Sequence, residues 1–200
     1  MKNKISGLVV GLGIVTSILE FGWPAKRQAV LHANDGDWDS PHVAPFVTTP
    51  HEVVKRMLEL AEIKKSDILY DLGSGDGRIV LAAAKNFKIR AVGFEIDPVL
   101  VKASRQLIKQ AGLEELVEIR EQDIRTIDFS PASVVTMYLY PAANLRLRPV
   151  LMRELKPGAR VISHDFGMGS WEPDRVERLE DTAGLSRTIY RWRIAEPPGR

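Results

Sequence analysis

The amino-acid sequence predicts an α/β protein whose parallel sheet is covered by helices on both faces. Short apolar runs at 68–72, 91–95 and 160–163 are typical of buried strands. The segments between them repeat apolar residues at helical spacing, and a glycine-rich loop follows the first run. Strands that alternate with helices in this way form a parallel sheet between two helical layers.

Local signals place each element along the chain. A first helix is expected from Thr49 or Pro50, because proline suits the first helical turn and Glu52 suits its positive end. Gly112 should end the helix that begins at Pro98, since glycine readily adopts the left-handed conformation after a helix. The remaining helices are expected at 78–86 and 145–155. The strands are expected at 68–72, 91–95, 117–120, 134–140, 160–163 and 188–194.

Length and composition limit the possibilities. With 200 residues, of which 44% are hydrophobic, the chain can form one domain with a packed core. It contains no cysteine, which excludes disulfides, thiolate metal ligands and thiol nucleophiles. Its four histidines, His32, His42, His51 and His164, lack the spacing of a metal site, so we expect no bound metal.

The formal net charge of +2 is unevenly distributed along the chain. Residues 1–33 hold four basic side chains and one acidic side chain, whereas the remainder holds 24 basic and 25 acidic side chains. The basic excess therefore belongs to the N-terminal segment. This distribution argues against a nucleic-acid partner for the domain that follows.

The N-terminal segment has the layout of a secretory signal or a membrane anchor. Lys2 and Lys4 precede an uncharged, largely apolar run at 5–19, and Leu31-His32-Ala33 offers a small-residue cleavage site. The glycines in this run disfavour the alternative of a buried soluble helix. We therefore expect a signal peptide or anchor at 1–33, a polar linker at 34–44 and a globular domain at 45–200.

The glycine-rich loop Gly73-Ser74-Gly75-Asp76-Gly77 is the expected ligand site. Glycines let a ligand approach the backbone, and the start of the following helix presents unpaired N–H groups. A dinucleotide fingerprint would have a third glycine where this chain has Arg78. Asp71 and Asp76 would repel a diphosphate but can meet an ammonium group. The loop therefore favours a cationic, zwitterionic ligand over a dinucleotide such as NAD.

Three segments resemble the motifs of the class I S-adenosylmethionine-dependent methyltransferases. They are Asp71-Leu72-Gly73-Ser74-Gly75-Asp76-Gly77, Gly93-Phe94-Glu95-Ile96-Asp97 and Glu121-Gln122-Asp123-Ile124. The resemblance implies a doubly wound, mostly parallel seven-stranded sheet and S-adenosyl-L-methionine as cofactor. It implies that Glu95 holds the ribose hydroxyls and that Asp123 accepts from the adenine amino group. The implied cofactor-binding residues are Asp71, Gly73, Ser74, Gly75, Asp76, Gly77, Glu95, Ile96, Asp123 and Ile124.

A narrower resemblance covers the start of the domain. Pro45-Phe46-Val47-Thr48-Thr49-Pro50 and the segment from Tyr70 to Val80 look like the small membrane-anchored protein-lysine N-methyltransferases. This implies methyl transfer to a lysine of a protein, a membrane-embedded one included, and membrane contact through the N-terminal segment. The Asn-Pro-Pro-Tyr type of motif found in nucleic-acid amino methylases is absent. Two alternatives stay open: methylation of a small apolar acceptor such as a quinone or lipid, and a nucleoside-cofactor-binding module without catalysis.

Candidate catalytic side chains follow the strands that face the expected ligand crevice, which lies at the carboxyl ends of the strands in a doubly wound sheet. A lysine ammonium must lose its proton before it attacks a methyl group, and a nearby acceptor can take that proton. Tyr138, Tyr140 and Asp165 are the candidates for this role, with His164 and Thr48 expected at the same edge. Packing of the tyrosines within a strand and capping of a turn by Asp165 are the simpler explanations.

The cofactor that the resemblance implies bears on location. S-adenosylmethionine is made in the cytoplasm, so export would separate the domain from it. We therefore expect an anchor at 5–25 with the domain facing the cytoplasm. Export after cleavage near Ala33 is the alternative.

Residues 146–160 form a basic stretch in which Glu154 is the one acidic residue. Its basic residues are Arg146, Arg148, Arg153, Lys156 and Arg160. We expect a solvated helix face, with contact to an acidic protein or anionic lipid as the alternative.

Overall fold

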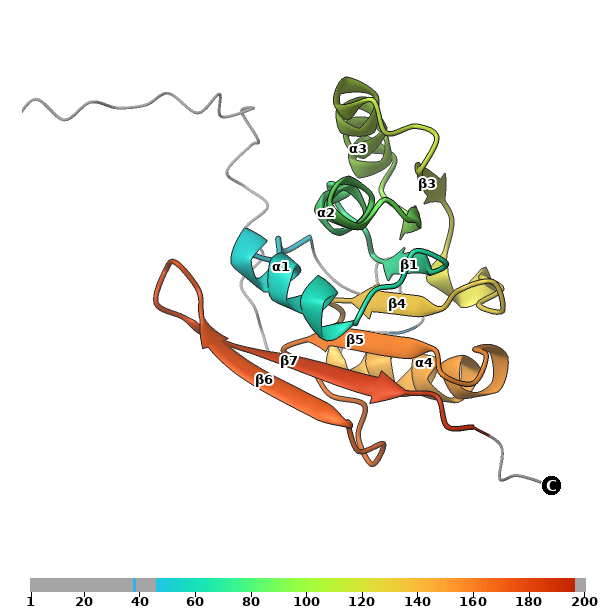
Figure 1. The fold of residues 1–200 in the computed structure, drawn as a ribbon, viewed down its shortest axis with the longest axis vertical. Helices are drawn as coiled ribbons and strands as arrows, with labels where there is room; N and C mark the ends of the chain where they lie inside the picture. The colour runs from blue at the N-terminus through green and yellow to red at the C-terminus, as the bar shows by residue number, and fades with distance from the viewer. Residues whose placement is uncertain (1–37, 39–45, 197–200) are drawn as a thin grey trace, which may run out of the picture. The chain divides into compact units, whose positions relative to one another are not determined.

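The computed structural model describes residue 38 and residues 46–196, which form a seven-stranded sheet with helices on both faces (Figure 1). The strand order is β3-β2-β1-β4-β5-β7-β6. Strands β1 to β5 run parallel, and β7 is antiparallel to both of its neighbours, β5 and β6. The strands are β1 (Ile68–Leu72), β2 (Arg90–Glu95), β3 (Val117–Glu121), β4 (Val134–Met137), β5 (Arg160–His164), β6 (Arg175–Glu180) and β7 (Ser186–Arg193). The predicted doubly wound, mostly parallel sheet is confirmed, with one antiparallel hairpin at its end.

Helices cover the two faces of the sheet unequally. The helices are α1 (His51–Leu60), α2 (Arg78–Phe87), α3 (Pro98–Ala111), α4 (Pro141–Glu154) and the short 3-10 helix η2 (Ile124–Thr126). Helices α1, α2 and α3 share one hydrophobic core with the sheet, and α4 and η2 share the other (Figure 1). Side chains alternate between the two cores along a strand, so that Leu69 packs with α1 to α3 while Tyr70 and Leu72 pack on the opposite face.

Strand β7 contributes to both cores. Its Ile189 is fully buried on the face covered by α1 to α3. Its Trp192 is fully buried on the other face, where the indole Nε1 donates to the carbonyl oxygen of Trp171 over 2.6 Å. A buried indole N–H needs such a partner, because an unpaired polar group would cost free energy. The C-terminal hairpin is therefore an integral part of the domain.

Most predicted elements are found within one or two residues of their expected limits, and two differ. Helix α4 begins at Pro141 rather than at 145, since a proline at the first helical position carries no N–H that needs a partner. Strand β4 ends at Met137 rather than at 140. The expectation that Tyr138 and Tyr140 lie within this strand is therefore wrong, because both lie in the loop that leads into α4.

Strand β6 has no counterpart among the strands that the sequence predicts. Its sequence, Arg-Val-Glu-Arg-Leu-Glu, is mostly charged, and the strand lies at the edge of the sheet with largely exposed side chains. Charged side chains are common on edge strands, where they discourage pairing with another molecule. This segment therefore lacks the apolar run from which the hydrophobic pattern would have predicted a strand.

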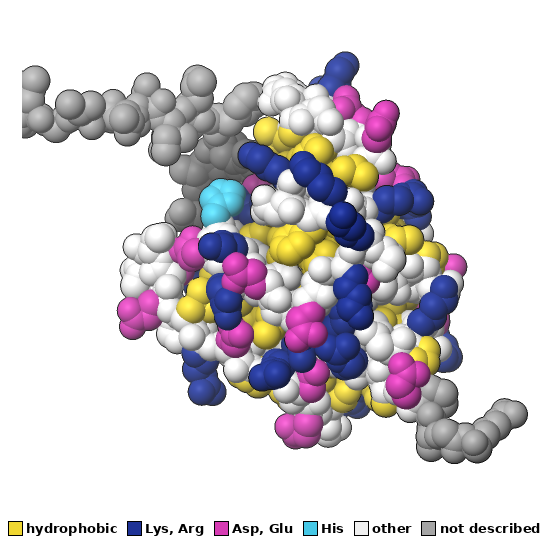
Figure 2. Space-filling model, viewed as in Figure 1, with side chains coloured by type: hydrophobic (Ala, Val, Ile, Leu, Met, Phe, Trp, Pro, Cys, Tyr) yellow, Lys and Arg dark blue, Asp and Glu magenta, His cyan; other side chains and the backbone are white. Residues whose placement is uncertain are grey.

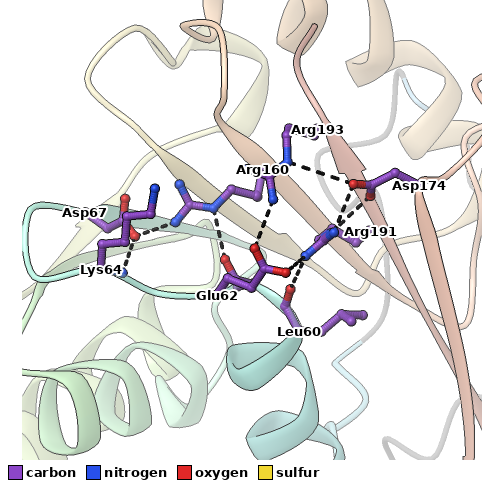
Figure 3. Close-up of polar contacts among 9 residues, drawn as sticks. Leu60, Glu62, Lys64, Asp67, Arg160, Asp174, Arg191 and Arg193 are labelled. Atoms are coloured by element: carbon purple, nitrogen blue, oxygen red, sulfur yellow. Dashed lines mark hydrogen bonds and ion pairs between the residues drawn. The ribbon is translucent and has the colours of Figure 1, made fainter.

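Two groups of ion pairs lie at the end of the sheet opposite the glycine-rich loop: one joins the amino ends of β1 and β5, and the other joins β7 to the segments that follow α1 and precede β6 (Figure 3). Arg160 is 4% exposed, pairs with Asp67 and donates from Nε to the carbonyl oxygen of Ala61 over 2.9 Å. Arg191, also 4% exposed, pairs with Glu62 and Asp174. The expectation that Arg160 belongs to a solvated basic face is therefore wrong.

The expected signal or anchor at 1–33 lies outside the described residues, as does the linker at 34–44 apart from Trp38. Their assignment stays a prediction. Among the helices formed by the described residues, none combines the length and the apolar character needed to cross a bilayer.

Candidate active site

The glycine loop lies between β1 and α2, at the carboxyl edge of the parallel strands (Figure 1). The N–H groups of Gly73 and Ser74 donate to the carbonyl oxygen of Phe94 over 3.0 and 2.9 Å, which ties the loop to β2. Gly75 adopts a φ of +56°, and a Cβ at this position would lie 2.5 Å from Phe46 Cε2. Glycine is therefore required at position 75 for its conformation and for the close approach of Phe46.

Gly93 of β2 allows the loop to pack directly on the sheet. A Cβ at Gly93 would lie 2.2 Å from Ser74 Oγ and 2.7 Å from Ile119 Cδ1. The Ser74 hydroxyl is buried and has no hydrogen-bond partner of good geometry among the described residues, although it lies near enough to Asp71 to contribute to lowering the pKa of that carboxyl group. Because an unpaired buried hydroxyl costs free energy, this group is suited to a polar ligand atom.

Asp71 is a buried carboxyl group at the base of the loop. It accepts a hydrogen bond from Thr136 Oγ1 over 2.7 Å. Burial raises the pKa of Asp71 to about 7, against the lowering effect of the Thr136 hydroxyl, and the negative charges of Asp76 and Glu95 add to the rise. A cationic ligand in this position would offset the cost of ionising Asp71.

Glu95 lies at the end of β2 and is 8% exposed. Its Oε2 accepts from the N–H of Gly75 over 2.8 Å. Its Oε1 accepts from the N–H groups of Ile96 and Asp97 over 2.8 and 3.0 Å. Three backbone donors therefore fix the carboxylate beside the loop, where its role as ribose ligand, and that of Ile96 beside it, stay predictions.

Asp76 is paired within the loop. The Nε of Arg78 lies 2.9 and 3.1 Å from the two carboxylate oxygens of Asp76, and Nη1 of the same side chain donates to the carbonyl oxygen of Thr49 over 2.8 Å. The charge of Asp76 is thus already balanced by a cation. Asp71 and Glu95 form no ion pair with the described residues. The role of Asp76 as a cofactor ligand stays a prediction.

Asp123 lies after β3 and caps η2 by accepting from the N–H of Arg125 over 2.9 Å. The Arg125 guanidinium also binds this carboxylate, and the hydrogen bonds from Arg125 lower the pKa of Asp123. Nη1 of Arg125 donates to the carbonyl oxygen of Trp38 over 2.8 Å. The neighbouring Ile124 is buried. The expected contacts of Asp123 and Ile124 with an adenine stay predictions.

These features fit a cationic nucleoside cofactor. The loop combines a close backbone approach at Gly75, an unpaired buried hydroxyl on Ser74 and a buried carboxyl group, Asp71, that a cation would help to ionise. The Glu95 carboxylate, which is held in place by backbone N–H groups, offers two acceptor oxygens. Two adjacent hydroxyl groups can donate to such a pair of oxygens. Within the described part of the chain, no group of three or more His, Asp or Glu side chains is arranged to hold a metal ion.

A second cluster follows β4 and β5 at the same edge of the sheet. The rings of Tyr138 and His164 lie with their centroids 4.0 Å apart, at an interplanar angle of 38°. Asp165 Oδ2 lies 3.5 Å from the Tyr138 hydroxyl and 3.3 Å from His164 Nε2. Thr49 Oγ1 lies 3.2 Å from His164 Nδ1. The structure therefore brings together Tyr138, His164 and Asp165, and adds Thr49 in place of the exposed Thr48.

Burial determines the protonation state of this cluster. His164 is 0% exposed, and its burial lowers the pKa of the imidazole to about 4 in spite of the nearby Asp165 carboxylate. Burial and the Asp165 charge both raise the pKa of the Tyr138 hydroxyl, while Arg187 lowers it. Near pH 7 the cluster therefore contains a neutral imidazole and a neutral phenol beside Asp165.

Tyr140 is not part of this cluster. It is the residue that precedes α4, and its hydroxyl makes no hydrogen bond to the described residues. The prediction that Tyr140 takes part in catalysis stays open.

Four residues near the site were not predicted from the sequence as site residues: Phe46, Arg78, Thr136 and Arg187. Arg78 stands two positions after Asp76, and this spacing at a helix start could have indicated the ion pair. Phe46 belongs to the segment at 45–50 that resembles the lysine methyltransferases, but nothing in that segment shows that its ring contacts the loop. Arg187 donates to Asp165 from 22 residues away, so no local pattern reveals it.

Comparison with known proteins agrees with this geometry. The ANTKMT methyltransferase domain family matches residues 71–175. A protein-lysine N-methyltransferase of Saccharolobus islandicus (strain REY15A) is 43% identical over 157 residues, which are 78% of this chain and 96% of that protein. A human lysine N-methyltransferase, named for a subunit of ATP synthase, is 33% identical over 197 residues, which are 96% of this chain and 78% of that protein.

A solved structure shares the fold at high sequence identity. It is described as an RNA methyltransferase from Salinibacter ruber in complex with S-adenosyl-L-homocysteine. It is 52% identical, covers 77% of this chain and 97% of its own, and superposes with a TM-score of 0.71. The fold, the loop and these relatives lead to one assignment: the chain belongs to the ANTKMT methyltransferase domain family and is an S-adenosylmethionine-dependent methyltransferase.

Proposed function

We propose that this enzyme methylates the side-chain amine of a lysine in a protein. The observation that carries the proposal is the pair formed by Tyr138 and Asp165, which lies beside the cofactor loop at the carboxyl edge of the sheet. The names of the relatives from Saccharolobus islandicus and human, both lysine N-methyltransferases, support the same acceptor.

The acceptor side suits an amine that arrives as a cation and reacts as a free base. When bound, the cofactor would supply a methyl group on a sulfonium, and a lysine attacks it only after its ammonium, with a reference pKa of about 10.4, has lost a proton to water. The N–CH3 bond forms as the S–CH3 bond breaks, so that S-adenosylhomocysteine is the leaving group. The Asp165 carboxylate attracts the incoming ammonium. The Tyr138 hydroxyl donates toward Asp165 Oδ2, so that its oxygen can accept an N–H of the neutral amine and direct the lone pair of the nitrogen.

RNA is the second candidate acceptor, because the Salinibacter ruber protein is described as an RNA methyltransferase. Charge disfavours this candidate. Asp165, Asp181 and Glu52 lie near the acceptor side, and the nearby cation Arg187 is already paired with Asp165 and Asp181. The face of the domain in Figure 2 carries acidic and basic side chains side by side, whereas a phosphate backbone is bound by clustered basic groups.

One labelling experiment separates these acceptors. The full-length protein is incubated with methyl-labelled S-adenosylmethionine and, separately, with membrane and soluble cell fractions, which are then treated with protease, ribonuclease or organic solvent. Protease-sensitive label that maps to lysine with a mass increase of one methyl group supports the proposal. Label that only ribonuclease releases, or that moves into the organic phase, contradicts it. Binding of S-adenosylhomocysteine without transfer to any fraction would indicate a binding module.

We further propose that the N-terminal segment holds the enzyme at a membrane, with the domain facing the cytoplasm and a membrane-embedded protein as substrate. The support is the uncharged run at 5–19 behind two lysines and the name of the human relative, which refers to a subunit of ATP synthase. Fractionation of the full chain and of a chain without residues 1–33 tests the location. Recovery of the full chain in the soluble fraction would contradict it.

A further inference from the structure

Arg187 joins the acceptor side of the site to the turn between β6 and β7. Its Nη1 donates to Asp165 Oδ2 over 3.3 Å, and its Nε donates to Asp181 Oδ2 over 2.8 Å. Strand β7 is antiparallel to β5 and pairs His164 with Ile189, so the start of β7 lies beside the carboxyl end of β5. One guanidinium therefore spans two carboxylates from separate elements at the edge of the sheet that carries the crevice.

Asp165 is held in an unusual conformation by β7. Its φ is +59°, which a residue with a side chain adopts only when its surroundings fix it. Its N–H donates to the carbonyl oxygen of Thr188 over 2.7 Å, and its Oδ1 accepts from the N–H of Thr188 over 2.9 Å. This leaves Oδ2 turned toward Arg187, Tyr138 and His164. The direction of Oδ2, and with it the direction of the Tyr138 hydroxyl, depends on these contacts.

The turn between β6 and β7 is itself well anchored. Asp181 is 7% exposed, and its Oδ1 accepts from the N–H groups of Ala183 and Leu185, both over 2.9 Å. The N–H of Thr182 donates to Glu52 Oε1 of α1 over 2.7 Å. The Asp181 carboxylate is therefore held in place, and its hydrogen bond with Nε of Arg187 fixes the position of the guanidinium.

We propose that Arg187 is a positioning residue for methyl transfer: by bridging Asp181 and Asp165 it fixes the carboxylate that orients the Tyr138 hydroxyl toward the acceptor amine. The inference rests on the proposed lysine acceptor, but the bridge itself is independent of the acceptor. It assigns the β6–β7 turn a role in the reaction although the turn comes after the five parallel strands in sequence and holds no predicted catalytic residue. Removal of the guanidinium leaves two carboxylates without their shared cation and lets Asp165 Oδ2 turn away.

The test compares three variants of the full-length enzyme. Arg187→Gln removes the charge, and Arg187→Lys keeps it but cannot bridge two carboxylates with a planar fork. Arg193→Gln is the matched control, because Arg193 lies on the same strand, is paired with Glu62 at 3.0 Å and lies at the opposite edge of the sheet. We measure kcat and KM with the acceptor protein that the labelling experiment identifies, together with the Kd of S-adenosylhomocysteine and the melting temperature. The pKa of Tyr138 is measured by NMR of ring-labelled tyrosine, with Tyr138→Phe for assignment.

We expect Arg187→Gln to lower kcat at least tenfold while the Kd of S-adenosylhomocysteine changes less than twofold, and Arg187→Lys to recover part of the loss. The Tyr138 pKa should rise in Arg187→Gln, since the nearby cation lowers it in the native protein, and should stay unchanged in Arg193→Gln. An unchanged kcat, or equal losses of kcat and cofactor affinity that follow the melting temperature, would overturn the inference. An unchanged Tyr138 pKa in Arg187→Gln would overturn it without any assay of the acceptor. Transfer by the native enzyme to RNA alone would overturn the proposed function instead.

Discussion

The ring of Phe46 lies against Gly75, with Phe46 Cε2 only 2.5 Å from the point where a Cβ of residue 75 would stand. Three residues later, Thr49 is buried beside His164 and its carbonyl oxygen accepts from Arg78. The segment that leads into α1 therefore contacts both halves of the site, the cofactor loop through Phe46 and the acceptor side through Thr49.

The contact between Phe46 and Gly75 predicts that Gly75→Ala impairs cofactor binding. An alanine pays about 1 kcal/mol or more for the left-handed conformation, and its Cβ must also displace the Phe46 ring. We expect the Kd of S-adenosylhomocysteine, measured by calorimetry, to increase at least about tenfold, which corresponds to about 1.4 kcal/mol. Gly112→Ala is the control, because Gly112 has a φ of +63° and no atom within 4 Å of its missing Cβ. Equal affinities of the two variants would refute this prediction.

Glu95 should be intolerant even of a change to glutamine. Both carboxylate oxygens accept backbone N–H groups, so an amide NH2 in place of one oxygen would face a donor with another donor. We expect Glu95→Gln to weaken binding of S-adenosylhomocysteine at least about tenfold and to lower the melting temperature, since a buried donor left unpaired costs about 1–3 kcal/mol. Glu118→Gln on the neighbouring β3 changes a half-exposed side chain and should leave the affinity within twofold. A Glu95→Gln variant with native affinity would show that the carboxylate is not needed.

The raised pKa of Asp71 predicts a pH-dependent cost of folding. Because the folded-state pKa of about 7 lies above the ordinary value of 3.8, the folded protein binds the extra proton between these two pH values. The stability that the protonated carboxyl group provides is therefore complete below pH 4 and is lost as the pH rises through about 7. At about 1.4 kcal/mol per pKa unit, the loss amounts to up to about 4 kcal/mol.

Urea unfolding between pH 4 and pH 8 checks this prediction. The free energy of unfolding of Asp71→Asn should increase relative to that of the native protein as the pH rises. The pKa of the exposed Asp128 is lowered by the N–H of Ser130, so Asp128→Asn should show no such trend over this range. If the difference in the free energy of unfolding between Asp71→Asn and the native protein stayed constant from pH 4 to pH 8, Asp71 would be ionised in the folded state throughout that range.

The buried ion pair of Arg160 and Asp67 predicts a large effect on stability and little effect on chemistry. Arg160→Met leaves the Asp67 carboxylate buried without its cation, which typically costs about 3–5 kcal/mol. The exposed pair of Arg153 and Glu154 is the comparison, and Arg153→Met should cost less than about 1 kcal/mol.

Chemical denaturation measures both changes in stability. The combined variant Arg160→Met with Asp67→Asn should regain part of the loss, because it no longer buries a lone charge. The kcat of folded Arg160→Met should stay near the native value, since Arg160 begins β5 whereas the site lies at the end of that strand. A large fall in the kcat of Arg160→Met without a change in its stability would contradict the prediction that this ion pair affects stability rather than chemistry.

The elements with strong local signals could be predicted from the sequence, and so could the position of the glycine-rich loop between β1 and α2. Pro98 and Gly112 mark the two ends of α3, and the run at 68–72 coincides with β1. The glycines of the loop have the conformations that the sequence pattern requires. In each case the physical cause lies within a few neighbouring residues, which is why the pattern is visible in the chain itself.

Contacts between distant segments could not be predicted in the same way. Arg160 lies in a basic stretch but pairs with Asp67, 93 residues earlier, so its burial depends on the sheet order rather than on its neighbours. Arg187 and Asp165 meet because β7 runs antiparallel to β5. Strand β6 is charged and lies at an edge, and therefore lacks the apolar pattern of a strand. These residues needed the three-dimensional arrangement before their roles could be assigned.

The position of β7 has a consequence for biosynthesis. This last strand of the domain inserts between β5 and β6, supplies Arg187 and Thr188 at one edge of the sheet and carries Arg191 and Trp192 at the other. A nascent chain that has not yet released β7 from the ribosome therefore lacks the support of Asp165 and two of the buried contacts of the domain. The sheet can therefore be completed only after β7 has left the ribosome.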